Sequence, residues 1–378
     1  MTQPAARRWH LVHGRWPRLL ALSALVGCGH SEPFASRDFS TDDPFDPSPP
    51  VQITLNHGHD RRAAWLPDGS AILYSTQLEG TRDGDVCLAV LPPTGGRQRA
   101  LTCTLSPDGD NLREALESPA PASDGRLAFV AATGQRGGVF PERQELSLAS
   151  ISDPVTRAGL LGMPYTIPGR RTHGGISQIH WLSSSRLLYL GEMVNVYTPC
   201  SGCMRDTMRS GLDAVWLDVT ASGSTPQPIP GTDNASGVSP GTAEDEIYYT
   251  LGGDTRVYHQ VLSSGVVSVI YDFGAAGVAR DVDVVGGRMA AVVGGRVHFV
   301  DDPSFGPTQW DSGGIVHVVN LADGADVTLT NPNEPGLYRR PRISPTGSQI
   351  VVERYPVVIF ETDTVVLRTG DLFLLGQP

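Results

Sequence analysis

The chain has 378 residues, of which 40% are hydrophobic, with 43 glycines, 30 prolines and a formal net charge of −11. This composition suits an all-β protein with many turns, and the acidic balance argues against nucleic-acid binding and against electrostatic attraction to anionic lipid. Since all 29 basic residues are arginines, no lysine is available for a P-loop, a pyridoxal phosphate Schiff base or a kinase-type phosphate site.

Residues 1–27 are predicted to be a secretory signal peptide. Four arginines and no acidic residue precede the apolar run Leu19–Val26, which is too short to remain as a spanning helix. The segment leads into Leu25-Val26-Gly27-Cys28, which resembles the bacterial lipobox. That resemblance implies that Cys28 is acylated, and the following Gly29 implies the outer membrane of a Gram-negative envelope. The alternative is a chance cysteine after an ordinary signal peptide.

Residues 28–50 are predicted to be a flexible, lipid-anchored linker, because they are rich in Ser, Asp, Pro and Phe without any periodicity. Residues 51–378 are predicted to form one domain, because a turn followed by a short apolar strand recurs throughout them. The turn residues of the six copies lie 41 to 61 residues apart, at Asp68, Asp124, Ser184, Asp245, Gly286 and Thr346. Four short strands and their turns need about 40 residues, which is the size of a propeller blade.

The first copy predicts a complete blade, with strands at Arg62–Trp65, Ala71–Ser75, Val86–Leu91 and Gln98–Thr104. The last copy is one strand short, because the chain ends soon after Leu372–Leu375. Val51–Leu55, just before the first blade, is predicted to supply the missing outer strand and so to remove an exposed sheet edge. The sequence therefore predicts an all-β, six-bladed β-propeller of four-stranded antiparallel blades, closed by an N-terminal strand.

The repeated phrase is similar to that of a known family. Trp65-Leu66-Pro67-Asp68-Gly69-Ser70, with its Ser-Pro-x-Gly variant at Ser344–Gly347, resembles the TolB-like β-propeller repeat, which also occurs in the propeller of prolyl oligopeptidases. This resemblance implies the fold for residues 51–378 and says little about function. The Asp-Gly pair is explained by the positive φ of a tight turn.

Four further cysteines agree with an oxidising compartment. Cys87 and Cys103 flank a Pro-Pro-Thr-Gly-Gly turn almost symmetrically, which predicts a cross-strand disulfide. Cys200 and Cys203 form a CxxC, for which a local disulfide is predicted. Redox chemistry would require a strand followed by a helix, and a zinc site would require a second ligand pair.

The candidate ligand-binding residues precede each predicted inner strand, where propeller loops line one mouth of the central channel. They form a polar, arginine-rich set that suits carboxylate ligands, unless the arginines and acids pair with one another across the channel. The set consists of Asp60, Arg61, Arg113, Glu114, His173, Asn234, Arg280, Asp281, Arg339 and Arg340.

No complete catalytic set is evident in the sequence. Gly237-Val238-Ser239-Pro240-Gly241 matches the nucleophile elbow of hydrolases, but Pro240 lacks the N–H that the oxyanion hole requires, so a structural role is predicted. His57 and His59 could share one strand face, but no dedicated third metal ligand accompanies them.

The leading hypothesis is a non-catalytic, lipid-anchored envelope module that binds a protein or peptide. No cofactor, metal or nucleic acid is expected, membrane contact is expected through the lipid only, and the protein is expected to be a monomer. The alternative is a secreted glycan lyase or hydrolase that uses His173, His57, His59 and nearby acids. A third possibility is a scaffold whose channel is packed shut.

Overall fold

The computed structural model describes residues 50–55, 59–77, 85–103, 112–135, 143–167, 171–197, 200–202, 206–220, 223–295, 297–302, 306–311, 314–331, 336–360, 363–366 and 370–376. The predicted signal peptide, Cys28 and the linker up to residue 49 lie outside this part of the chain. His57 and Cys203 also lie outside the described residues. Within the described residues, no helix has the length and apolar character that a membrane span requires.

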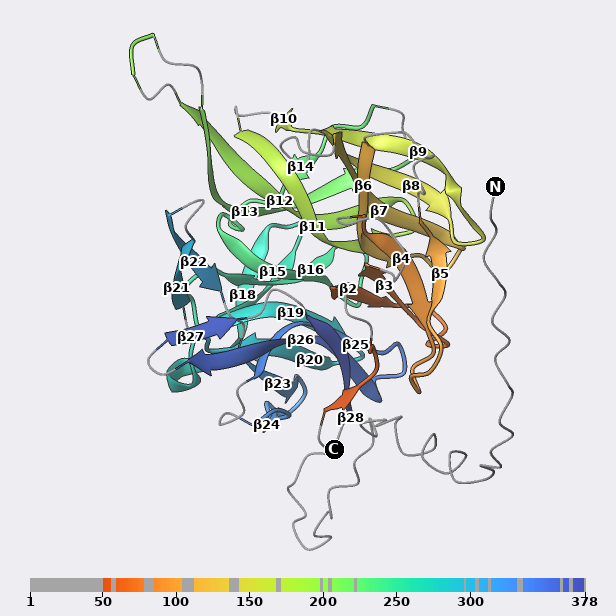
Figure 1. Cartoon of the computed structure of the whole chain (residues 1–378). Helices are drawn as coiled ribbons and strands as arrows, with labels where there is room; N and C mark the ends of the chain where they lie inside the picture. The colour runs from red at the N-terminus through yellow and green to blue at the C-terminus, as the bar shows by residue number, and fades with distance from the viewer. Residues whose placement is uncertain are drawn as a thin grey trace, which may run out of the picture. The chain divides into compact units, whose positions relative to one another are not determined.

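The chain is all-β, as predicted, and its strands form six four-stranded antiparallel sheets. Figure 1 shows these sheets, with their inner strands near the middle. From the inner to the outer strand, blade 1 is β2 (Asp60–Trp65), β3 (Ile72–Thr76), β4 (Cys87–Leu91) and β5 (Arg99–Thr102). Blade 2 is β6 (Leu112–Pro121), β7 (Arg126–Gln135), β8 (Arg143–Ser150) and β9 (Asp153–Met163).

The remaining blades follow the same order. Blade 3 is β11 (Arg171–Ser183), β12 (Arg186–Tyr197), β13 (Asp206–Asp218) and β14 (Gln227–Pro228). Blade 4 is β15 (Ala235–Pro240), β16 (Glu246–Leu251), β17 (Arg256–Val261) and β18 (Val266–Asp272). Blade 5 is β19 (Ala279–Val285), β20 (Arg288–Val293), β23 (Ile315–Asn320) and β24 (Asp326–Thr328). Blade 6 is β25 (Gly336–Ile343), β26 (Gln349–Phe360), β28 (Asp371–Gly376) and β1 (Val51–Gln52).

Four short strands and one 3-10 turn supplement the blades. The strand β10 (Tyr165–Ile167) pairs with β11, and β27 (Asp363–Val366) pairs with β26. A hairpin of β21 (Val297–Asp302) and β22 (Gly306–Asp311) is inserted between the second and third strands of blade 5. The turn η1 spans Gly274–Ala276.

The N-terminal strand completes blade 6, as the sequence predicts. Val51 lies opposite Leu374 in β28, and the Ile53 N–H donates to the Leu372 carbonyl at 2.9 Å. The regular strand is shorter than the predicted Val51–Leu55, because the Oγ1 of Thr54, rather than the Ile53 carbonyl, accepts the Leu372 N–H at 2.9 Å. The chain is therefore a closed, six-bladed β-propeller.

The hydrophobic core is divided among the contacts between neighbouring blades. Six clusters of buried side chains occupy the six junctions, including the one that joins blade 6 back to blade 1. In that closing cluster, Trp65 and Tyr74 of blade 1 pack with Val351 and Leu374 of blade 6. Burial on both faces explains why segments such as Met289–Val293 are continuously apolar and almost fully buried.

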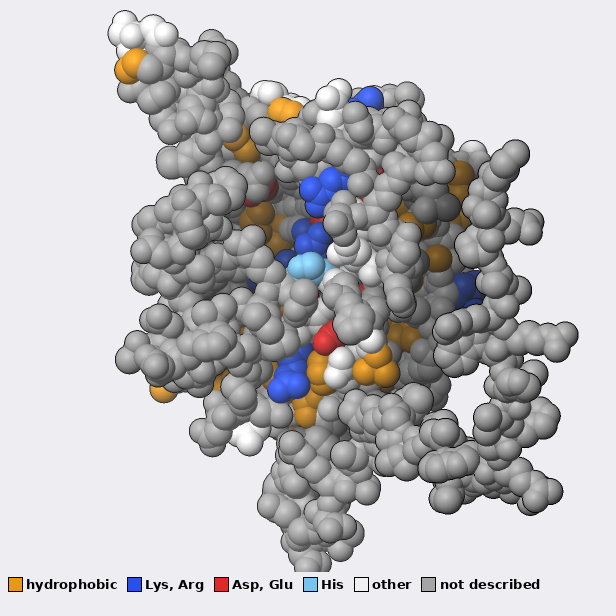
Figure 2. Space-filling view, viewed as in Figure 1, with side chains coloured by type: hydrophobic (Ala, Val, Ile, Leu, Met, Phe, Trp, Pro, Cys, Tyr) orange, Lys and Arg blue, Asp and Glu red, His pale blue; other side chains and the backbone are white. Residues whose placement is uncertain are grey.

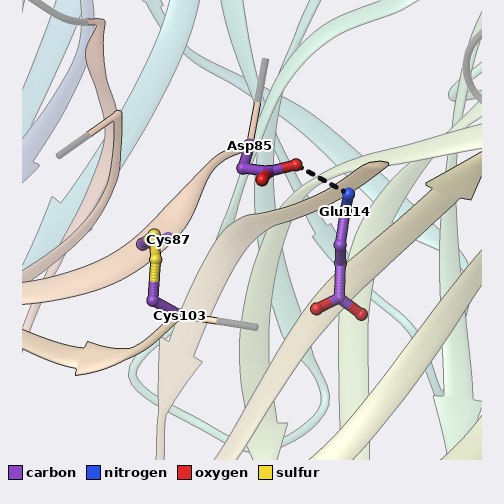
Figure 3. The surroundings of a disulfide bond; sticks show 4 residues. All are labelled: Asp85, Cys87, Cys103 and Glu114. Atoms are coloured by element: carbon purple, nitrogen blue, oxygen red, sulfur yellow. Dashed lines mark hydrogen bonds between the residues drawn. A yellow bond between two sulfur atoms is a disulfide. The ribbon is translucent and has the colours of Figure 1, made fainter. Parts of the chain in front are cut away.

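The predicted disulfide between Cys87 and Cys103 is present at the outer part of blade 1 (Figure 3). Beside it, an Asp85 Oδ1 accepts the Glu114 N–H of β6 at 3.2 Å, which links blade 1 to blade 2. Cys200 is disulfide-bonded, whereas Cys203, its predicted partner, lies outside the described residues.

Candidate ligand-binding axis

A β-bulge in each inner strand determines which side chains meet on the propeller axis. The register of β2 shifts between Arg61 and Ala64, and each of the other five inner strands shifts at the corresponding place, with two further shifts in β11. In five of the six, the bulge contains a non-glycine residue with positive φ: Arg62, Ser118, Gln178, Asp281 and Arg340. Such a conformation costs about 1–3 kcal/mol and persists only where the surroundings enforce it.

Side chains at these bulges and Glu353 of β26 form one connected group, which we call the axial charge network. It consists of Arg61, Arg62, Glu117, Asp281, Arg339, Arg340 and Glu353. The end of the axis where these arginines reach the surface is the arginine mouth. Figure 2 shows arginine side chains and a histidine gathered near the middle of the face that it views.

Glu117 and Glu353 connect blades 1, 2 and 6. Glu117 forms ion pairs with Arg61 and with Arg62, the latter at 2.5 Å between Nη1 and Oε2. Glu353 accepts the backbone N–H of Arg62 at 2.5 Å and the Arg340 Nη1 at 2.7 Å. The Tyr355 hydroxyl also donates to Glu353, at 2.8 Å. These bonds satisfy a carboxylate whose side chain is fully buried.

Asp281 makes the equivalent connection from blade 5. Its Oδ2 lies 3.4 Å from the Arg339 Nε and accepts the Arg340 N–H at 3.3 Å, and its Oδ1 accepts the Gln178 Nε2 at 2.9 Å. The positive φ at Asp281 and Arg340 is therefore held in place by hydrogen bonds between blades.

The arginines of the network are more exposed than its acids. The side chains of Arg61 and Arg339 are 28% and 26% exposed, whereas those of Asp281 and Glu353 are 2% and 0% exposed. Four guanidinium groups share three carboxylates. The mouth therefore presents hydrogen-bond donors to solvent, with the carboxylates below them.

These contacts shift the pKa values of the acids. Burial alone would raise the pKa of Glu117, but the charges of Arg62, Arg61 and Arg340 lower it below its ordinary value. Burial likewise opposes ionisation of Asp281, but Arg339 and Arg340 lower its pKa. Both carboxylates are therefore charged at neutral pH.

Below the network the axis is nearly closed. A cavity of about 20 Å³ remains, which is room for about one water molecule. Arg62, Ser118, Gln178 and Arg340 are among the residues that line it, so the bulges of four blades fill the centre.

The structure brings together Arg61, Asp281, Arg339 and Arg340 of the predicted set in the axial charge network. Asp60 is fully buried in blade 1, where its Oδ1 accepts the Thr76 hydroxyl at 2.5 Å. Arg280 precedes Asp281 in β19, opposite Val292 of the same blade.

The predicted residues of blades 2, 3 and 4 lie away from the network. Arg113 and Glu114 lie near the start of β6, and Glu114 pairs with Arg157 of β9 at 2.6 Å. His173 is fully buried between Tyr165, at 3.0 Å from its Nδ1, and Asp213, at 3.2 Å from its Nε2.

Asn234 precedes β15, and its side chain donates to the Gly252 carbonyl at 3.3 Å. His59 of the alternative enzyme set accepts the Gly370 N–H at 3.4 Å. Among the described residues, no group of three or more His, Cys, Asp or Glu side chains is arranged to hold a metal ion. Ser239 of the elbow-like motif is buried in β15, and its hydroxyl accepts the Val284 N–H at 3.0 Å.

Sequence reasoning missed Arg62, Glu117 and Glu353. The inner strands of blades 2 and 3 are 10 and 13 residues long, and their bulges at Ser118 and Gln178 lie several residues after the strand begins. Residues near the start of these strands are therefore not the ones at the bulges. The turn offers a better reference, because the bulge residue lies six positions before the turn residue in four blades. These pairs are Arg62 and Asp68, Ser118 and Asp124, Gln178 and Ser184, and Arg340 and Thr346.

No protein-family model matches the chain, and no curated protein matches it. Solved structures do resemble it. A gluconolactonase from Xanthomonas campestris aligns with a TM-score of 0.52 and 13% identity, over 89% of this chain and 97% of its own. A luciferin-regenerating enzyme aligns with a TM-score of 0.51 and 10% identity, over 87% and 95% of the two chains. TolB from Acinetobacter baumannii aligns with a TM-score of 0.44 and 14% identity, over 85% of this chain and 64% of its own.

At these identities the likeness shows the shared fold alone. The function has to be argued from the axis itself.

Proposed function

We propose that this chain is an exported, lipid-anchored propeller of the cell envelope that binds an acidic segment of a protein or peptide at the arginine mouth, without catalysis. The observation that supports this proposal is the composition of the axial charge network, in which four arginines share three carboxylates, two of them buried. A carboxylate from a partner would meet guanidinium donors, which bind such groups bidentately.

The absence of catalysis is proposed because the acids at the mouth are already engaged. Glu353 accepts from Arg62, Arg340 and Tyr355, and Asp281 accepts from Gln178 and Arg340. A general acid or base must exchange a proton with a bound substrate, so a carboxylate that is committed to several internal donors suits a structural role better.

Anchoring is tested separately from binding. If the lipobox-like motif is used, Cys28→Ser will release the protein from the membrane fraction, whereas the wild type will stay with it and incorporate labelled palmitate. Wild-type protein that is found only in the soluble fraction would contradict the anchor and leave the binding proposal untouched.

Binding is tested with a displayed library of random peptides, selected on the purified protein and then titrated by calorimetry. We expect the selected peptides to be rich in Asp and Glu. Arg61→Ala and Arg339→Ala should each weaken binding by roughly 10- to 100-fold, because each removes a charge-assisted hydrogen bond of about 1.5–3 kcal/mol. Arg256→Ala is the matched control, because Arg256, at the start of β17 in blade 4, pairs with Asp254 and not with a residue of the network.

Two results would contradict this function. One is a set of selected peptides without acidic enrichment, or with an affinity that both mouth variants leave unchanged. The other is stoichiometric manganese, calcium or zinc in the purified protein, which would favour the glycan lyase or hydrolase alternative.

A further inference from the structure

The opposite end of the axis contains a different cavity, which we call the aromatic funnel. It has a volume of about 380 Å³, at the small end of the range for small-molecule sites. All six blades contribute to it, through the last residues of their inner strands and the turns that follow. Its wall includes Trp65, Trp181, Pro121, Pro240 and Pro345.

The wall of the funnel offers apolar surface and few free polar groups. The indole N–H of Trp65 donates to the Arg342 carbonyl of blade 6, and that of Trp181 donates to the Ala120 carbonyl of blade 2, each at 2.9 Å. Both N–H groups are thus used between blades, and the two rings contribute carbon atoms to the wall, with the Arg126 guanidinium over the Trp181 ring at 4.5 Å. The prolines have no N–H to offer.

Two charged residues at the inner part of the funnel neutralise each other. Arg342 and Asp283 form an ion pair at 3.3 Å, and the second carboxylate oxygen of Asp283 accepts the Ile343 N–H at 2.7 Å. Their side chains are only 12% and 8% exposed. The charged side chains that line the funnel therefore have no net charge, so the funnel favours an uncharged ligand.

His180 is the polar side chain of the funnel that lacks its full set of partners. Its Nε2 is buried and has no hydrogen-bond partner among the described residues. Burial and the nearby charge of Arg342 lower the pKa of His180 well below its ordinary value, although a hydrogen bond to the Val238 backbone opposes this shift. The ring is therefore neutral. Since Nε2 has no partner among these residues, the hydrogen bond to the Val238 backbone is made by Nδ1. In the neutral ring Nδ1 then carries the proton, and the unprotonated Nε2 can accept a hydrogen bond.

We propose that the aromatic funnel is a second binding site, which takes a neutral aromatic ring with a hydroxyl donor at its far end, the side chain of a tyrosine in a partner protein. The ring covers the apolar wall, and a rotation of the His180 side chain, whose Nε2 is buried in the free protein, lets the phenolic O–H donate to that nitrogen. Tyrosine is a frequent anchor in protein interfaces for this combination of an apolar body and a polar tip.

A sugar ring fits this wall less well. It carries several hydroxyl groups that would lose water, and the funnel provides one unpaired acceptor and an ion pair whose members already bind each other. The tyrosine site lies at the other end of the axis from the arginine mouth and does not depend on it.

The test uses N-acetyltyrosinamide and N-acetylphenylalaninamide, which differ by one hydroxyl group, titrated into the mature full-length protein and followed by NMR. We expect the tyrosine probe to bind about 10- to 100-fold more tightly, because the phenylalanine probe leaves a buried acceptor unpaired. His180→Phe should remove this preference while leaving the affinity for the phenylalanine probe unchanged. His259→Phe, on β17 of blade 4, is the matched control and should keep the preference.

The comparison of the two probes on the wild type stands even where a variant fails to fold. Equal affinities, or no binding of the tyrosine probe at millimolar concentration, would overturn the proposal. So would its displacement by methyl glucoside, which would point to a sugar site. Failure of this test leaves the acidic-peptide titration unaffected, because that titration reports on the arginine mouth.

Discussion

The two ends of the propeller axis are built from the same six inner strands, but one end is lined by charged side chains and the other mainly by apolar ones. At the arginine mouth, charged side chains bond across the blades, and the carboxylates of Asp281 and Glu353 are buried beneath guanidinium groups. At the aromatic funnel, Trp65 and Trp181 connect blades through their indole N–H groups and leave an open apolar cavity. One end therefore fills the axis with paired charges, although the Nε atoms of Arg61, Arg62 and Arg340 lack a hydrogen-bond partner within the described part of the chain, and the other keeps a space with one unsatisfied acceptor.

This difference arises at the bulges. A bulge places an extra residue in the strand and exposes a backbone N–H that the sheet no longer pairs. In this propeller the freed N–H groups of Arg62 and Arg340 are taken by Glu353 and Asp281. Beyond the bulges of β2 and β25 the strands return to regular pairing, and at the funnel end the Asp283 carboxylate accepts the Ile343 N–H.

The largest effect is expected from breaking the charge network. Arg340→Met leaves the carboxylate of Glu353 buried without its guanidinium partner, which should reduce the free energy of unfolding by about 3–5 kcal/mol. Urea denaturation measures this loss. Arg256→Met is the control, because the Arg256 side chain is 47% exposed, and it should change stability less. A variant as stable as the wild type would show that the network does not hold the blades together.

A smaller loss in the free energy of unfolding is expected from a substitution at the funnel. Trp65→Phe keeps an aromatic ring in the wall but removes the bond to the Arg342 carbonyl and part of a buried side chain, which should cost about 2 kcal/mol in unfolding free energy. Thermal unfolding followed by circular dichroism measures it. Trp216→Phe, whose indole is partly exposed, should cost less. A loss at Trp65 equal to that at Arg340 would remove the contrast between the two ends.

The smallest effect concerns Asp371 at the start of β28, the strand of blade 6 that pairs with the closing strand β1, and it depends on pH. Burial, together with the charge of Asp60, raises the pKa of Asp371 to about 6, although Arg354 opposes this shift. In the unfolded chain the group ionises near its ordinary value of 3.8. The folded state therefore binds the proton more tightly, so the ionised carboxylate costs stability above pH 6, and that cost disappears as the pH falls toward 4.

Asp371→Asn removes this ionised carboxylate. We expect it to raise the free energy of unfolding by about 1 kcal/mol at pH 8, after allowance for solvent screening of a partly exposed group, and to give no gain near pH 4. Unfolding curves across this pH range measure the effect. A gain that is constant with pH would contradict the assignment to ionisation of Asp371.

Much of the architecture was predictable, because its signals are local. The spacing of the turns predicted six blades, and the strands of blade 1 and the Cys87–Cys103 disulfide were found where expected. The closing strand was predictable because the last blade lacks one strand, and β1 supplies it. Its regular part ends at Gln52 rather than Leu55, because a side-chain hydroxyl took over one of the backbone bonds.

The candidate site was predictable only in part. The sequence prediction selected the residues just before each predicted inner strand. This rule selected Arg339 and Arg340 correctly, because the bulge of β25 lies only a few residues after the strand begins. The same rule selected His173 in blade 3, where the strand is 13 residues long and the histidine is buried against Tyr165 and Asp213. Glu353 lies on a second strand, so no rule based on inner-strand loops could select it.

The amino-acid order alone determined the number of blades, the closing strand and one disulfide, because tight turns, strand length and cysteine spacing act within a few dozen residues. Only the tertiary structure decided which charges meet on the axis and that His180 retains a bare nitrogen in the funnel. These depend on bulges in strands that are far apart in the chain, and on side chains that become neighbours only when the ring is closed.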